Sequence, residues 1–197
     1  ATPGIFSVKK YAETLNQVIS RRGISTRYQQ NLTAVRPDER EAVFTDGEGN
    51  PAVVGYDMLH VAPPQGPPRF VAESPLAGEG GWIEADRDTL RHPRYPNVFS
   101  IGDASSLPTS KTGAAIRAQA PVLTRNLLDV MAGQQPSATY DGYTACPLVT
   151  GYGKLLMAEF DYDLEPDPSL PLIDSGKERW SWYQFKRYGL PWFYWNV

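Results

Sequence analysis

The chain has little of the chemistry that metal sites and disulfides need. Its 197 residues include one cysteine, Cys146, and two histidines. One thiol cannot close a disulfide within the chain, and no metal-binding motif is present. A lone cysteine also indicates a reducing compartment. His60 and His92 lie near no acid, base or metal cluster in the sequence, so we expect neither to have a chemical role.

Long apolar runs and clustered positive charge are also missing. No run approaches the roughly 18 apolar residues of a membrane-spanning helix, and no signal peptide is visible. The net charge is −3, and no basic cluster is present that could bind phosphates, which argues against a nucleic-acid partner. No G-x-G-x-x-G fingerprint occurs, so the chain lacks the usual cradle for a dinucleotide pyrophosphate.

The most informative pattern lies in residues 95–114. Val98–Ile101 predict a short buried strand, and Gly102 after it lets the backbone come close to a ligand. Asp103 would then lie just past the end of the strand, where a carboxylate can hold a ribose or ribityl hydroxyl. An ordinary turn is the alternative interpretation of this Gly-Asp pair.

A helix is predicted directly after this turn. Thr109–Thr112 offer hydroxyls for its N-cap, and its positive end would face the ligand of Asp103. That placement suits negative charge on a reduced flavin. Pro121 inside the helix should remove one hydrogen bond and produce a kink. Gly133 should terminate the helix.

Cys146 lies in a segment of turns and short apolar runs. Residues 143–149 and 154–160 predict two strands of a hairpin that carries this cysteine. We expect three side chains of the second strand to share one face: Leu155, Met157 and Phe160. A redox or nucleophilic thiol and a small buried side chain remain alternatives for Cys146 on this evidence.

The first 68 residues predict a helix, a β-meander and a connector. The helix would run from Ser7 as N-cap to Arg22, with Gly23 ending it. The four strand-like runs that follow are Ile24–Gln29, Asn31–Arg36, Glu41–Thr45 and Ala52–Val61. The prolines of residues 62–68 favour an extended connector.

Residues 177–197 differ sharply from the rest in composition. They hold nine aromatic side chains interleaved with four lysines and arginines. Such a mixture suits a membrane interface, since amphipathic rings settle at the headgroup level and cations reach lipid phosphates. A tail that closes an aromatic core is the alternative, and single-stranded nucleic acid is disfavoured by the overall acidity.

Four segments together resemble one family. In order, they are Ile-Gly-Asp-Ala (101–104), Leu-Pro-Thr-Ser-Lys-Thr (107–112), Tyr-Asp-Gly-Tyr-Thr-Ala-Cys-Pro-Leu-Val-Thr-Gly-Tyr (140–152) and Ala-Glu-Phe-Asp-Tyr (158–162). With them the chain resembles a C-terminal portion of the sulfide:quinone oxidoreductases, more narrowly the branch with the mitochondrial enzyme.

The resemblance implies an α/β fold. It would be a partial FAD/NAD(P)-binding two-domain flavoprotein fold with a β-meander and a C-terminal helical, aromatic-rich tail. Residues 1–68 would form the second half of the middle, NAD(P)-binding-like domain. Residues 69–174 would form the C-terminal part of the FAD-binding domain with the redox-cysteine hairpin, and residues 175–197 a tail that faces membrane or quinone.

The resemblance also implies roles for particular residues. Gly102 and Asp103 would contact the ribityl and phosphate region of FAD, and Lys111 and Thr112 would lie beside the isoalloxazine. Cys146 matches one of two cysteines that carry sulfur derived from sulfide, while its partner belongs to the half that is absent. The residues expected at the membrane and quinone entrance are Trp192, Phe193 and Trp195.

The implied activity is oxidation of sulfide through a cysteine pair and FAD, with reduction of quinone. The protein would be peripheral to the bacterial cytoplasmic membrane or the mitochondrial inner membrane. One alternative is a type II NADH dehydrogenase-like flavoprotein, which shares Gly102 and Asp103 but does not require Cys146. Another is a non-catalytic piece that binds a partner or forms a homodimer. We expect the isolated chain to be inactive and to hold FAD partially or not at all.

Overall fold

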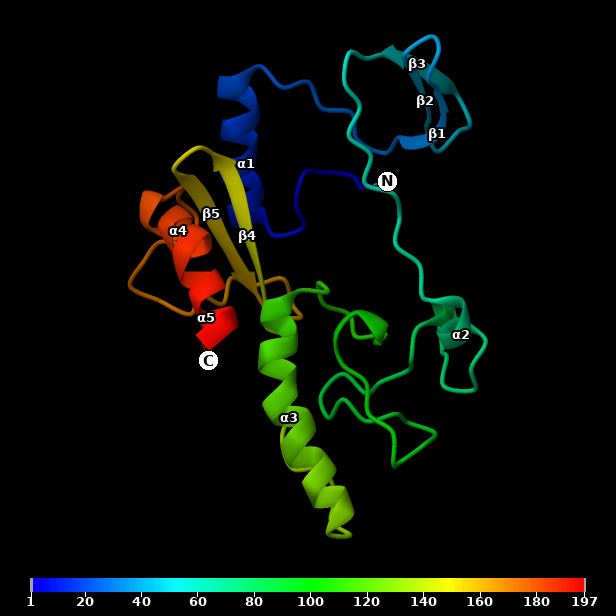
Figure 1. Ribbon diagram of the computed structural model, residues 1–197, viewed down its shortest axis with the longest axis vertical. Coiled ribbons are helices and arrows are strands. Elements are labelled where there is room, and N and C mark those ends of the chain that lie inside the picture. Colours follow the sequence, from blue (N-terminus) through cyan, green and yellow to red (C-terminus); the bar gives the residue numbers. More distant parts are fainter. Residues whose placement is uncertain (1, 197) are drawn as a thin grey trace. The chain divides into compact units, whose positions relative to one another are not determined.

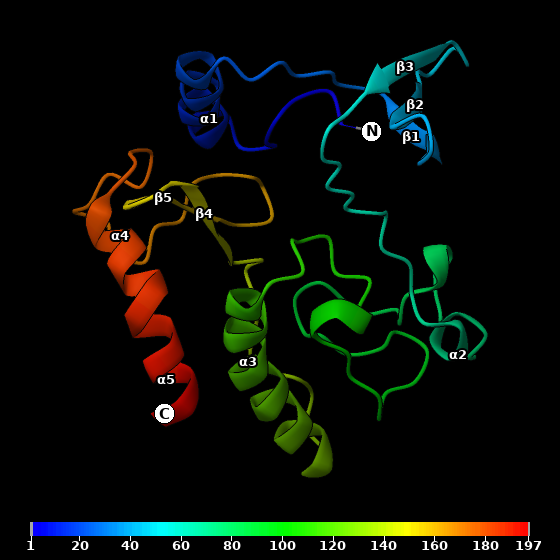
Figure 2. The ribbon, with the colours of Figure 1, turned by 45° about the horizontal axis from the view of Figure 1, so that its top comes forward.

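The computed structural model describes residues 2–196, which form two compact units (Figures 1 and 2). The first unit extends to Gln65 and the second begins at Gly66. The division therefore falls inside the proline-rich segment 62–68. No helix of the described residues is both long and apolar enough to cross a membrane.

The first unit contains helix α1 (Lys9–Arg22) and a three-stranded antiparallel sheet in the order β1-β2-β3. Its strands are β1 (Asn31–Arg36), β2 (Glu41–Thr45) and β3 (Pro51–Gly55). The predicted meander is thus present. Helix α1 ends at Gly23, whose φ of 63° is the left-handed conformation that glycine favours.

Three details of the prediction for this unit are wrong. The N-cap of α1 is Val8 rather than Ser7, and no side chain caps the helix. Residues 24–29 form no strand, because they have no partner strand in the described sheet and the chain turns at Gln29 with a φ of 56°. The run predicted for Ala52–Val61 ends at Gly55, since the partner strand β2 begins at Glu41 and Glu41 pairs with Gly55.

The second unit combines one long helix, one hairpin and a helical tail. Its regular elements are α2 (Arg69–Ala72), α3 (Gly113–Met131), β4 (Thr144–Gly151), β5 (Lys154–Phe160), α4 (Trp180–Gln184), a π-helix (Phe185–Gly189) and α5 (Leu190–Asn196). Two short 3-10 turns, Glu79–Gly81 and Gly102–Ala104, interrupt the coil between α2 and α3. Pro191 has no N–H to donate, and the π-helix comes directly before the turn that contains it.

The strand predicted for Val98–Ile101 is absent. Phe99 forms one isolated antiparallel bridge with Arg91, and the Ser100 N–H donates to the Leu90 carbonyl at 3.0 Å. This apolar run therefore pairs with coil in the part of the unit that the structure describes. It leads directly into the Gly102–Ala104 turn.

Helix α3 begins and ends where the sequence predicts. The Thr112 hydroxyl caps it by accepting from the Ala115 N–H at 3.1 Å, Pro121 lies inside it, and Gly133 follows it with a φ of 74°. Its buried side carries polar residues as well as apolar ones. The Asn126 amide donates to the carbonyls of Thr89 and Ala138, both at 2.9 Å, and so ties the helix to the surrounding coil.

The hairpin β4–β5 is the predicted one, with Cys146 opposite Ala158. Leu155 and Met157 share one face of β5 as expected, but Phe160 lies on the other face because it is an odd number of positions away. All residues from Leu155 to Phe160 are buried. Helix α4 packs on β5, and the loop after β5 returns to form a bridge between Phe160 and Pro166 (Figure 1).

Candidate functional site

Three segments of the second unit meet at the N-terminal end of α3: the Gly102–Ala104 turn, the loop through Lys111, and the start of β4. Gly102 packs against the first turn of α3, where a Cβ would come within 3.0 Å of the Ile116 side chain. Its N–H donates to the buried Gln119 Oε1 at 2.9 Å. Its carbonyl accepts from the Ser105 hydroxyl at 2.8 Å. The backbone of the glycine is therefore bonded within the protein.

Asp103 is the exposed residue of this turn. Its backbone carbonyl accepts from Lys111 Nζ at 2.6 Å, and the same ammonium donates to the Ser105 carbonyl at 2.6 Å. The Lys111 ammonium also lies 3.8 Å from the centroid of the Trp82 ring. Desolvation lowers the pKa of Lys111, and the negative charge of Asp103 opposes that shift.

Thr112 joins the start of α3 to the strand that carries the cysteine. Its hydroxyl is 2.9 Å from the hydroxyl of Thr144, which in turn donates to the Ser110 carbonyl at 3.2 Å. Thr144 and Cys146 are two positions apart on β4 and therefore point to the same face. The cysteine is thus on the face of β4 that carries Thr144, the residue bonded to the end of α3.

The Cys146 thiol is half-buried. Burial raises its pKa, and the nearby Lys186 ammonium acts in the opposite direction. Lys186 belongs to the π-helix of the tail and donates to the carbonyl of Pro147, the next residue after the cysteine, at 2.8 Å. A cation is therefore held near the thiol and offsets part of the effect of burial, which raises the pKa of Cys146 on balance.

Sequence reasoning missed three residues of this site: Trp82, Gln119 and Lys186. Gln119 is 1% exposed. The only sequence signal for its role in the site is its place two turns into a predicted helix. Its bond to Gly102 spans 17 positions and that of Lys186 to Pro147 spans 39, so neither pairing could be found from local spacing.

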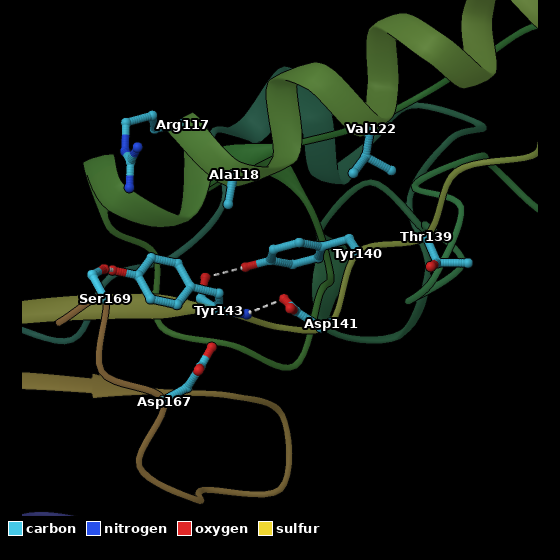
Figure 3. Close-up of a pocket in the computed structure, with 9 residues that line it drawn as sticks. All are labelled: Arg117, Ala118, Val122, Thr139, Tyr140, Asp141, Tyr143, Asp167 and Ser169. Atoms are coloured by element: carbon cyan, nitrogen blue, oxygen red, sulfur yellow. Dashed lines mark hydrogen bonds between the residues drawn. The ribbon is translucent and has the colours of Figure 1, made fainter. Parts of the chain in front are cut away.

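A separate pocket of about 330 Å³ lies between α3 and the start of β4 (Figure 3). Figure 3 shows the Tyr140 hydroxyl and the Asp141 carboxylate bonded to the backbone of Tyr143, at 2.5 and 3.0 Å. Burial raises the pKa of Tyr143 to about 12. None of the residues predicted for the site lines this pocket, whose lining is Arg117, Ala118, Val122, Thr139, Tyr140, Asp141, Tyr143, Asp167 and Ser169.

The tail is helical from Trp180 to Asn196, and its aromatic rings are mostly exposed. Trp192, Phe193 and Trp195 are 57%, 49% and 79% exposed. The Trp192 and Phe193 rings pack edge to face, with centroids 5.3 Å apart. Most rings of the tail are therefore exposed in the second unit, while Trp182 and Tyr183 are partly buried.

Comparisons with known proteins agree with these features. No protein-family model matches the chain. The mitochondrial sulfide:quinone oxidoreductase of Mus musculus is 48% identical over 195 residues, which are 98% of this chain and 43% of that protein. That of Dictyostelium discoideum is 45% identical over 197 residues, 100% of this chain and 43% of that protein. The structure of the sulfide:quinone oxidoreductase from Aquifex aeolicus matches with a TM-score of 0.79 at 18% identity, over 96% of this chain and 45% of that one.

The fold is therefore a mixed α/β fold that matches part of the Aquifex aeolicus structure. Sequence identity of 45–48% over nearly the whole chain makes it a homologue of part of the sulfide:quinone oxidoreductases. The chain spans less than half the length of the curated relatives that it matches.

Proposed function

We propose that this chain is the C-terminal portion of a protein that oxidises sulfide and reduces a membrane quinone. The observation that carries the proposal is the hydrogen bond between Thr112 and Thr144, because it fixes the cysteine strand to the N-terminal end of α3. The exposed Asp103 lies on a turn that packs against the same end of the helix. A thiol and a flavin-binding carboxylate would thus share one site.

The residues present fit one part of an FAD molecule. Asp103 offers an exposed carboxylate for a ribityl or ribose hydroxyl, and Thr112 satisfies the third N–H of α3. The N–H groups of Gly113 and Ala114 have no acceptor within their own helix, so this end suits a polar or negatively charged group. Gly102 allows the close approach of the turn to the helix. Asp103 and Thr112 are the side chains that we assign to this part of the cofactor, and Lys111 lies beside them with its ammonium on the backbone of the turn.

Cys146 would act as one of two redox cysteines, the other lying outside this chain. Hydrosulfide attacks their disulfide, so that one S–S bond breaks, a persulfide S–S bond forms, and the second cysteine leaves as a thiolate. Bound FAD would supply two-electron transfer from sulfur to quinone. Overall, sulfide loses two electrons, quinone gains two electrons and two protons, and the oxidised sulfur leaves on an acceptor.

Lys186 would stabilise the thiolate form of Cys146. Its ammonium is held in place by the Pro147 carbonyl, and its charge lowers the pKa of the thiol against the effect of burial. The Thr112–Thr144 pair would keep the cysteine strand in register with the helix end. Lys186 would thus favour the thiolate and the threonine pair would position the strand, and none of the three side chains would form a bond to sulfur.

The tail would contact the membrane and line the quinone entrance. Trp192, Phe193 and Trp195 expose large rings, and such rings favour the headgroup region of a bilayer. The relatives from Mus musculus and Dictyostelium discoideum, at 45–48% identity, are mitochondrial, which favours the mitochondrial inner membrane over a bacterial location. We keep the domain assignment of residues 1–68, 69–174 and 175–197 as part of this proposal, and with it the expectation that the isolated chain is inactive.

The test is Cys146→Ser in the full-length protein, with Val149→Ser as a control. Val149 is exposed on the same strand and has no role in the proposed site. We expect sulfide-dependent quinone reduction to fall to background in the cysteine variant and to persist in the control. Unchanged turnover in Cys146→Ser would make the cysteine structural. Flavin reduction by NADH instead of sulfide would support the type II NADH dehydrogenase alternative, which the comparisons do not favour.

A further inference from the structure

The Lys111 ammonium is held by three groups on one side of the Gly102–Ala104 turn. It donates to the carbonyls of Asp103 and Ser105, both at 2.6 Å, and lies 3.8 Å from the centre of the Trp82 ring. An ammonium has three donors, so two of them are committed to backbone carbonyls of the turn. The aromatic face interacts with the same charge through its negative quadrupole.

The backbone next to Trp82 is bonded to the same turn. The Ile83 N–H donates to the Ala104 carbonyl at 2.9 Å, and the Ser106 N–H donates to the Ile83 carbonyl at 2.9 Å. The backbone next to Trp82 is therefore fixed beside the turn by two hydrogen bonds of Ile83. Lys111 and Trp82 come from segments far apart in sequence and act on one short stretch of backbone.

The opposite side of the turn is bonded to α3. Gln119 accepts from the Gly102 N–H, and Ile116 packs against Gly102. With Lys111 on the Asp103 and Ser105 carbonyls, the backbone on both sides of the Asp103 side chain is fixed. The orientation of this exposed carboxylate then depends on the ammonium, which holds the residue by its own carbonyl.

We propose that Lys111 and Trp82 are positioning residues that set the direction of the Asp103 carboxylate, rather than groups that contact the cofactor with their own polar atoms. This inference rests on the proposed function, in which Asp103 holds a cofactor hydroxyl. It assigns Trp82 a role as the ring that holds the Lys111 ammonium against the turn. Partial desolvation lowers the pKa of Lys111, and the charge of Asp103 opposes this shift.

The first measurement is hydrogen–deuterium exchange of the peptide that contains residues 102–106, in full-length protein stripped of its cofactor. We expect Lys111→Met to speed exchange of the Ser105 and Ser106 amides about tenfold, the size expected when charge-assisted hydrogen bonds are lost. Lys111→Arg should restore slow exchange, because a guanidinium can also reach two carbonyls and stack on an indole. Lys154→Met, which removes an exposed lysine at the hairpin, is the matched control.

The second measurement is FAD affinity of the same full-length variants. Lys111→Met and Trp82→Leu should each weaken binding about tenfold, and Trp82→Phe should lose less because it keeps a ring over the ammonium. If Lys111→Met weakens FAD binding while exchange at residues 102–106 stays slow, Lys111 contacts the cofactor directly and the inference is wrong. Unchanged exchange and unchanged affinity in both Lys111→Met and Trp82→Leu would also overturn it.

The two proposals fail in different ways. Asp103→Asn should weaken FAD binding without faster exchange, because its backbone carbonyl remains available to Lys111. If Asp103→Asn leaves FAD affinity unchanged while Lys111→Met still speeds exchange, the lysine positions the turn but the assignment of Asp103 to the cofactor fails. Should Lys111→Met fail to fold, Trp82→Leu and Lys111→Arg test the same contacts without removing the charge.

Discussion

The N-terminal end of α3 is held by buried polar contacts, whereas the C-terminal tail consists mainly of exposed aromatic rings. Around α3, buried polar groups such as Gln119 each satisfy a specific backbone atom. In the tail, rings such as Trp195 are exposed, and Lys186 supplies a hydrogen bond to the hairpin. A site built from single polar contacts should be sensitive to single substitutions. A binding surface made of several exposed rings should lose only part of its binding with each ring that is removed.

The largest effect should come from adding one methyl group at Gly142, close before the strand that carries Cys146. Its φ is +92°, and a Cβ there would lie 2.2 Å from the Tyr162 ring. We expect Gly142→Ala to destabilise the protein by about 3 kcal/mol or more, from backbone strain and steric overlap together. Urea unfolding of full-length protein would measure this.

Gly113→Ala is the matched control for that substitution. Gly113 begins α3, and a Cβ there would meet no atom within 4 Å. The free energy of unfolding should therefore stay the same or rise slightly. Similar losses in both variants would mean that the packing around Tyr162 does not carry the stability of this region.

A smaller loss should follow from Gln119→Leu. The substitution keeps a buried side chain of similar size but leaves the Gly102 N–H without its acceptor, which costs about 1–3 kcal/mol. The same unfolding measurement applies, and FAD affinity should fall with it because the turn loosens. Gln119→Glu, which restores an acceptor oxygen, would help to separate the hydrogen bond from packing. Full stability of the leucine variant would contradict the view that single polar contacts hold this site.

Local signals in the sequence predicted the pieces of this site better than their arrangement. The Thr112 cap, the strand Glu41–Thr45 and the left-handed Gly23 depend on nearby residues, and each occurs as expected. The strand at Val98–Ile101 does not form, because a strand needs a partner and these residues bridge to Arg91 in coil. Ser7 offered a cap that the helix does not use.

The candidate site shows the same limit. Cys146, Asp103 and Thr112 were selected as single residues, and the fold brings their segments to one end of α3. Their partners Trp82 and Lys186 lie far along the chain, and no local spacing connects them. A lone aromatic or a lone cation in a sequence has many uses, so only the three-dimensional contacts distinguish these two.

The pH dependence of Cys146 alkylation should test whether one residue of the tail, Lys186, controls the charge of the thiol. Burial raises the pKa of the thiol and Lys186 lowers it, so Lys186→Met should raise the pKa further. At neutral pH the thiolate fraction then falls, and the pH profile for alkylation of Cys146 in the reduced protein should move to higher pH. Lys177→Met, which removes an exposed lysine paired with Asp174, should leave the profile in place. An unchanged profile in Lys186→Met would mean that the ammonium does not act on the sulfur.

The smallest effect on stability should come from the exposed rings of the tail. The side chains of Trp192, Phe193 and Trp195 are each about half exposed or more. Replacing all three with alanine should therefore change the free energy of unfolding little. Liposome binding should weaken and the KM for a long-chain quinone should rise, since both depend on the exposed ring area. Flavin reduction by sulfide should stay intact, because under the proposed function that half-reaction takes place at Cys146. Each single substitution should give only a fraction of the triple effect. If one of them alone abolishes liposome binding, the tail acts through a specific contact. The tail would then be as sensitive to single substitutions as the end of α3.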